Sequence, residues 1–194
     1  MRIGVLGLQG AVREHLRSLG RLGIESRVVK NVEELTGLSG LILPGGESTA
    51  ISLLAGGSLF EALQRFGRSG LPLFGTCAGM ILLAKEIEER TTPTLAAIDI
   101  AVARNASGRQ IDSFETVLDV AGIGSDVPAV FIRAPYIARL GDGVTPMAKY
   151  DGFVVMARQR NVLVTSFHPE LTDDLRIHRY FVGMVSENTE EDST

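Results

Sequence analysis

The stretch "PLFGTCAGMILLAKEI", residues 72–87, joins a short apolar run to a helical pattern through closely spaced glycines. It contains Cys77, the only cysteine of the chain, between Gly75 and Gly79. The spacing Gly-x-Cys-x-Gly is that of a nucleophile elbow, a tight strand-to-helix turn that needs small residues two positions before and after the nucleophile. Free N–H groups and the helix dipole at such a turn favour a thiolate. The pattern therefore predicts a reactive Cys77 rather than a small buried core residue.

Strands and helices alternate on both sides of this elbow. Short apolar runs predict strands at 2–8, 25–30 and 71–75, with a third strand opening the segment 38–49. Helical stripes are predicted at 11–23, at 78–90 and, in two pieces broken at Gly56 and Gly57, over 50–67. This alternation predicts an α/β fold with an open, mainly parallel sheet flanked by helices.

The second half of the sequence changes character. Strands are expected, with little helix between them, at 95–105, 113–120, 128–135, 152–160 and 162–167. Some of these strands are expected to form antiparallel pairs at the edge of the sheet. A last helix is predicted at 173–187, followed by a polar, acidic tail at 188–194. No repeat or linker marks a boundary, so residues 1–194 are expected to form one domain.

Composition excludes several classes of protein. The net charge of −4 is spread over 194 residues without a basic cluster, so neither nucleic acid nor an anionic membrane is an expected partner. No apolar run approaches the roughly 20 residues that span a bilayer. A single cysteine excludes a disulfide framework and a multi-cysteine metal site. A cytoplasmic location and a site without metal or cofactor are expected.

His168 and Glu170 are the candidate base and orienting group for the thiol. The chain has three histidines, and His168 alone follows an apolar strand, in the sequence "HPEL". Pro169 favours an extended His168, and residues i and i+2 of an extended chain face the same way. The pair is therefore predicted to project together, with the carboxylate orienting the imidazole. His15 and His178 lie in helical patterns and are expected to be surface or helix-packing residues.

The segment "LPGGEST", residues 43–49, is a glycine-rich loop at another strand end. Its backbone N–H groups could form an oxyanion hole together with the N–H of Ala78. A plain turn with a helix cap at Ser48 or Thr49 is the alternative. The loop lacks the Lys-Ser/Thr ending of a phosphate-binding P-loop.

Together these elements resemble the class I (triad) glutamine amidotransferases, and within them the glutaminase subunits of pyridoxal 5′-phosphate synthases. The resemblance covers nearly the whole chain. The particular stretches are "GVLGLQGAVREH" (4–15), "GLILPGGEST" (40–49), "GTCAGMILLAKEI" (75–87), "RNASGRQIDSFE" (104–115), "VFIRAP" (130–135) and "SFHPELT" (166–172). It implies a flavodoxin-like sheet and a glutaminase activity.

The resemblance also implies roles for individual residues. Cys77, His168 and Glu170 would form the catalytic triad, with oxyanion-hole N–H groups from Gly46 and Ala78. The implied glutamine-binding residues are Gly46, Glu47, Ser48, Arg104, Ile132 and Arg133. Free glutamine carries a carboxylate and an ammonium group, so a pocket with both charge signs is expected, for which Arg104 and Glu47 are plausible.

The chain is expected to need a partner protein that uses the released ammonia. It has no further domain in which released ammonia could be used, and the resemblance implies a synthase subunit that builds pyridoxal 5′-phosphate. Gly45-Gly46 and Gln9-Gly10 end two strands of the same sheet, and docking of the partner is expected to complete the oxyanion hole there. The free subunit would then be nearly silent.

Two alternatives from other classes stay open at this point. A DJ-1/PfpI-like protein also carries a cysteine at an elbow, although such proteins commonly place histidine directly after it, where this chain has Ala78. A non-catalytic regulatory subunit that binds only glutamine or the partner is the other, against which the complete Cys77, His168 and Glu170 set argues.

Overall fold

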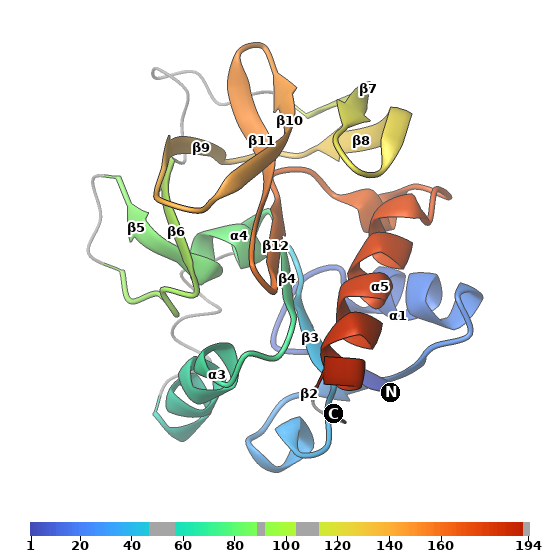
Figure 1. Ribbon diagram of the computed structural model, residues 1–194, viewed down its shortest axis with the longest axis vertical. Helices are drawn as coiled ribbons and strands as arrows, with labels where there is room; N and C mark the ends of the chain where they lie inside the picture. The colour runs from blue at the N-terminus through green and yellow to red at the C-terminus, as the bar shows by residue number, and fades with distance from the viewer. Residues whose placement is uncertain (47–56, 89–91, 104–112, 192–194) are drawn as a thin grey trace.

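Five parallel strands form the centre of the fold (Figure 1). The structure, a computed structural model, describes residues 1–46, 57–88, 92–103 and 113–191. The strand order β2-β1-β3-β4-β12 is the 2-1-3-4-5 order of a flavodoxin-like sheet. The strands are β1 (Arg2–Leu6), β2 (Glu25–Val29), β3 (Gly40–Leu43), β4 (Leu73–Thr76) and β12 (Val162–Thr165). The expectation of a mainly parallel α/β sheet is confirmed.

The register of these strands brings three loops together. Leu43 of β3 pairs with Gly75 of β4, and Thr165 of β12 pairs with Thr76 of β4. The three strands are parallel, so their carboxyl ends lie side by side at one edge of the sheet. The segments that follow them, which contain Gly45, Cys77 and His168, therefore start from neighbouring positions.

Strands β1, β3, β4 and β12 are buried on both faces, because helices cover both sides of the parallel strands. On one face α1 (Val12–Arg21) and α5 (Arg176–Glu191) lie side by side, as Figure 1 shows, and their apolar residues share a core with Ile42, Phe74 and Leu163. On the other face α3 (Ser58–Arg68) and α4 (Ala78–Leu83) pack against Leu41, Leu43 and Leu73.

Beyond β12 the sheet continues mainly in antiparallel pairs, as expected for its edge, although the last two strands, β5 and β6, pair in parallel. The order runs β12-β11-β9-β6-β5, and β10 pairs with β11. These strands are β5 (Ala84–Ile87), β6 (Ile98–Ala103), β9 (Tyr136–Leu140), β10 (Thr145–Tyr150) and β11 (Phe153–Gln159). A separate hairpin is formed by β7 (Phe114–Val120) and β8 (Gly124–Phe131).

Two helix ends differ from the sequence predictions, and two strands were not predicted. The helix predicted over 78–90 ends at Leu83, because the chain continues into β5, which pairs with β6. Strands β9 and β10 were not predicted. Helix α5 runs to Glu191, past the predicted end at 187, and residues 192–194 lie outside the described part of the chain. The first of the two helical pieces predicted over 50–67 falls on undescribed residues, and α3 is the second.

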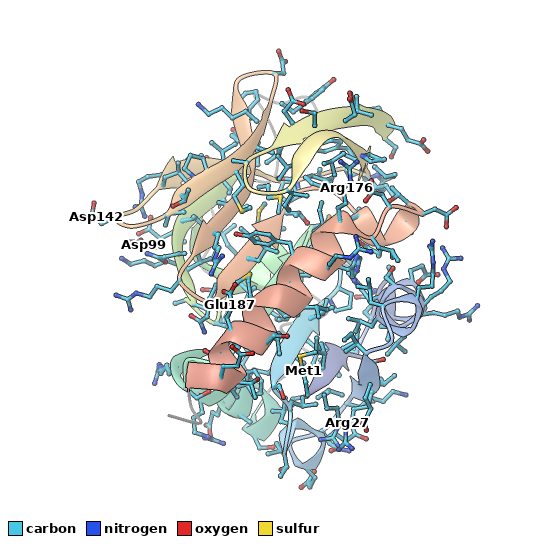
Figure 2. The ribbon with its side chains drawn as sticks, turned by 45° about the vertical axis from the view of Figure 1, so that its right-hand side comes forward. Met1, Arg27, Asp99, Asp142, Arg176 and Glu187 are labelled. Atoms are coloured by element: carbon cyan, nitrogen blue, oxygen red, sulfur yellow. The ribbon has the colours of Figure 1, made fainter. Side chains whose placement is uncertain are left out.

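Arg176 anchors the start of α5, which crosses in front of the strands in Figure 2. Its guanidinium donates hydrogen bonds to the carbonyl oxygens of Ser125 and Asp126 in β8, at 2.8 and 3.0 Å. It also pairs with Asp174 at 2.7 Å. The β7–β8 hairpin is thereby tied to the helix that covers the sheet.

Within the described ranges no helix is both long enough and apolar enough to cross a membrane.

Candidate active site

Cys77 lies in the turn between β4 and α4, where the elbow motif predicts it. Its backbone has φ 50° and ψ −105°, a conformation that L residues rarely adopt. Its N–H donates to the carbonyl oxygen of Thr165 at 2.8 Å, which fixes the turn against the end of β12. The side chain is buried, with 8% of the residue exposed.

Both glycines of the elbow lie at positions where no side chain fits. A Cβ on Gly75 would stand 2.6 Å from the carbonyl carbon and oxygen of Gly79. A Cβ on Gly79 would stand 1.9 Å from the carbonyl oxygen of Leu43 in β3. Helix α4 therefore rests directly on the backbone of two strands, and the small residues are needed for this close packing.

His168 and Glu170 meet beside the elbow. His168 Nδ1 lies 2.7 Å from Glu170 Oε1, and the carboxylate is fully buried. The geometry differs in one respect from the expected extended chain: Pro169–Leu171 form a 3₁₀ turn, η2, for which His168 is the N-cap. Pro169 stands at its first position, where the fixed φ of proline suits a helix. His168 N–H donates to the carbonyl oxygen of Val130 in β8 at 2.8 Å.

The imidazole also lies against the Cys77 side chain. Burial lowers the pKa of His168, but hydrogen bonds with the side chains of Cys77 and Glu170 outweigh it and raise that pKa to about 10. Nδ1 is occupied by Glu170, so Nε2 is the nitrogen left for the thiol. Burial also works against the charge of Glu170, but His15 and His168 overcome it and hold the pKa of that carboxyl below its ordinary value. The three side chains thus form a buried thiol–imidazole–carboxylate series.

The loop after β3 closes over this series. A Cβ on Gly45 would stand 2.2 Å from His168 Cε1 and 3.2 Å from Cys77 Cβ, so the loop, the imidazole and the nucleophile's side chain meet at this glycine. A Cβ on Gly10, whose φ is +92°, would lie 1.5 Å from the carbonyl oxygen of Gly45. The segment after β1 therefore packs on the loop that contains Gly46, at the point where the strand order reverses.

The other predicted site residues are described only in part. Ala78 is the first residue of α4, so its N–H is free of intrahelical bonding and adjoins the thiol. Ile132 and Arg133 follow β8 on the surface, two and three residues after the carbonyl that binds His168. Glu47, Ser48 and Arg104 lie outside the described residues. Among the residues that are described, no cluster of three or more His, Cys, Asp or Glu side chains could hold a metal ion.

The two remaining histidines, predicted to be surface or helix-packing residues, pack against each other where α1 and α5 meet, beside the site. His15 and His178 are fully buried and touch each other, with His15 Nδ1 3.0 Å from His178 Nε2. His15 Nε2 lies 3.6 Å from Glu170 Oε1, so it borders the series directly. A signal was available: His15 stands three residues after Val12 and four before Leu19, on the buried side of the helical stripe.

Replacement of His178 by phenylalanine is expected to reduce acid sensitivity. Burial, with a smaller effect of His15, lowers the pKa of His178 to about 3. His178 therefore binds a proton more readily in the unfolded chain than in the folded one. Its contribution to the free energy of unfolding is complete above the ordinary pKa of 6.5 and is lost as the pH falls from there towards 3. Urea unfolding of both proteins at pH 8 and pH 5 measures this. Between these two pH values, the free energy of unfolding of His178→Phe should rise by about 2 kcal/mol relative to that of wild type. If the stability difference between the two proteins is the same at both pH values, His178 is not a neutral, buried residue.

Comparison with known proteins identifies what the chain is similar to. The SNO glutamine amidotransferase family matches residues 5–187. A relative from Carboxydothermus hydrogenoformans, "Pyridoxal 5'-phosphate synthase subunit PdxT", is 56% identical over 187 residues, which cover 95% of this chain and 98% of that protein. One of the same name from Brevibacillus brevis is 53% identical over 188 residues, covering 96% and 98%. A crystal structure of a glutamine amidotransferase aligns with a TM-score of 0.89 at 49% identity, covering 95% and 98%.

Proposed function

The chain belongs to the SNO glutamine amidotransferase family, and from that membership we propose that it hydrolyses L-glutamine to glutamate and ammonia with Cys77 as nucleophile. The observation that carries this proposal is the buried contact series from Cys77 through His168 to Glu170 at the ends of β4 and β12. Membership of this family argues against the alternative of a DJ-1/PfpI-like protein. The cytoplasmic location and the absence of a resident cofactor stay predictions.

The first half of the reaction forms a thioester. The Cys77 thiolate attacks the side-chain carboxamide carbon of glutamine, and the C–N bond breaks as His168 gives its Nε2 proton to the departing ammonia. The developing oxyanion is stabilised by the backbone N–H groups of Gly46 and Ala78. Glu170 keeps the proton of His168 on Nδ1, which directs Nε2 to the sulfur.

The second half regenerates the thiol. His168 Nε2, now neutral, takes a proton from water as the oxygen attacks the thioester carbon. The C–S bond breaks, glutamate leaves with the new oxygen, and the thiolate pairs again with the imidazolium. The remaining proposed glutamine contacts are Glu47, Ser48 and Arg104, with Ile132 and Arg133 at the end of β8.

The ammonia is delivered to a synthase subunit that makes pyridoxal 5′-phosphate, in a hetero-oligomer with this chain. Support comes from the relatives, which are named as subunits of that synthase. Support for regulation by docking comes from the close contact of Gly10 with Gly45, because movement of the segment after β1 must move the loop that contains Gly46. The free subunit is therefore nearly silent, and docking completes the oxyanion hole.

Glutamate release from L-glutamine, by the protein alone and mixed with the synthase subunit, tests the proposal. Release that rises at least about 10-fold with the partner is the expected result, the size of effect that one oxyanion donor commonly has or exceeds. Equal rates alone and in the complex would refute the regulation but not the activity. If no release occurs with the partner, covalent labelling of Cys77 by an electrophilic glutamine analogue separates a mismatched partner from a chain that is only regulatory.

A further inference from the structure

A buried row of polar side chains leads from Glu170 through helix α1 to helix α5. His178 of α5 contacts His15 of α1, at 3.0 Å between Nε2 and Nδ1, and His15 Nε2 lies 3.3 Å from Thr76 Oγ1. Thr76 Oγ1 in turn accepts a hydrogen bond from the N–H of Gly45 at 3.0 Å. His15 belongs to α1 and His178 to α5, the two helices that lie side by side in Figure 1. His15 therefore borders the orienting carboxylate, the residue before the nucleophile and, through Thr76, the glycine loop.

The buried carboxylate of Glu170 has few neighbours that can stabilise its charge. Its carboxylate is fully buried, Oε1 accepts from His168, and Oε2 has no hydrogen-bond partner among the described residues. A buried carboxylate with few donors is costly. Apart from His168, the only imidazole or cationic side chain within 4.0 Å of it in the described part of the chain is that of His15, at 3.6 Å.

Burial lowers the pKa of His15, so the ring is neutral near pH 7 and carries one proton. If that proton were on Nδ1, the bare Nε2 would face the carboxylate oxygen, and His178 would hold an N–H at Nδ1, which has no partner in the described structure. With the proton on Nε2, the N–H is directed at Thr76 Oγ1 and Glu170 Oε1, while Nδ1 accepts from His178 Nε2–H. Each arrangement leaves one buried donor without an acceptor in the described structure, the His178 Nδ1–H in the first and the Thr76 hydroxyl in the second. The repulsion between a bare Nε2 and Glu170 Oε1 at 3.6 Å therefore decides for the proton on Nε2.

We propose that His15 is a positioning residue whose Nε2–H supports the Glu170 carboxylate and the Thr76 hydroxyl, and that His178 holds His15 in this tautomer. The proposal deepens the proposed function, because it assigns to a third histidine the support of the pair that orients His168. By stabilising the ionised Glu170, His15 stabilises the imidazolium that donates the proton to ammonia. It touches neither the thiol nor the expected position of the substrate.

Imidazole NMR of the wild-type protein tests the tautomer without a variant and without an activity. Long-range ¹H–¹⁵N correlation of the three histidines at pH 7 distinguishes a protonated Nε2 from a protonated Nδ1. We expect Nε2–H tautomers for both His15 and His178. A proton on Nδ1 of His15, or a doubly protonated His15, would overturn the proposal while leaving the assignment of Cys77 as nucleophile untouched.

Kinetics of the complex with the synthase subunit test the role. His15→Phe keeps a ring but removes the N–H, while His15→Gln can place an amide N–H near the position of Nε2. We expect His15→Phe to lower kcat for glutamate release by roughly 10- to 100-fold, the range for removing a polar group that supports a buried charge, with less than a twofold change in KM. His15→Gln should recover most of kcat.

Each other outcome counts against the proposal. Full kcat in a folded His15→Phe variant, or equal losses in His15→Phe and His15→Gln, would show that the N–H is not needed. If neither variant folds, the wild-type tautomer decides. If the wild-type complex releases no glutamate, the proposed function itself is refuted. Failure of the proposal for His15 and failure of the proposed function are therefore distinguishable.

Discussion

Replacement of Cys77 by alanine is expected to abolish glutamate release in the complex with the synthase subunit, a loss of at least about 10⁴-fold in kcat. The substitution removes only the sulfur of a side chain that is already buried, and no other cysteine in the chain can replace it. The measurement is kcat of wild type and variant, with circular dichroism to establish that both are folded. Residual activity above about 1% would mean that another group is the nucleophile.

Replacement of the same residue by glycine separates chemistry from backbone strain. Residues with a Cβ that are held at sparsely populated angles such as those of Cys77 cost about 1–3 kcal/mol, and glycine relieves this at a cost of about 0.5–1 kcal/mol in chain entropy. Cys77→Gly should therefore be about 1 kcal/mol more stable than Cys77→Ala in urea unfolding, and equally inactive. A less stable glycine variant would show that the elbow stores no strain.

The elbow could be predicted from the sequence because its requirements are local. A tight turn between strand and helix needs small residues at fixed spacing, and Gly75 and Gly79 stand at that spacing around the only thiol. The parallel half of the sheet followed for a similar reason, since strands buried on both faces form short continuous apolar runs.

The contact between His168 and Glu170 was expected for a reason that is only partly right. The side chains meet at 2.7 Å, but across a 3₁₀ turn and not along an extended strand. Pro169 disfavours a helical His168 and also suits the first position of a helix, so the local sequence is compatible with both geometries. The tertiary contacts of η2 with α1 and β8 decide between them.

The buried histidines and the extra strands depend on contacts between distant parts of the chain. His15 and His178 are 163 residues apart, and each would be a costly residue in an apolar core without the other as a partner. Strand β9 pairs with β6 and β11, and β10 packs as a hairpin on β11. Such pairings are set by the surrounding sheet, which local propensity does not encode.

Among the variants considered, the largest effect on stability is expected for Gly79→Ala, which should lower the free energy of unfolding by about 3–5 kcal/mol. The added Cβ would lie 1.9 Å from the carbonyl oxygen and 2.8 Å from the carbonyl carbon of Leu43, and both atoms belong to the backbone of β3. No rotation of a side chain can relieve that overlap. Either α4 moves away from the sheet or β3 loses its register with β4, and in both cases the Cys77 turn is displaced.

Gly20→Ala is the matched control, because it makes the same substitution inside a helix, α1, where a Cβ would meet nothing within 4 Å. There the gain in helix propensity should stabilise the protein by up to about 1 kcal/mol. Urea unfolding of both variants at pH 7 therefore tests a difference in sign as well as in size, and a Gly79→Ala variant already unfolded without urea agrees with it. If Gly79→Ala were as mild as Gly20→Ala, the close approach of α4 to β3 would not be what requires glycine at the elbow.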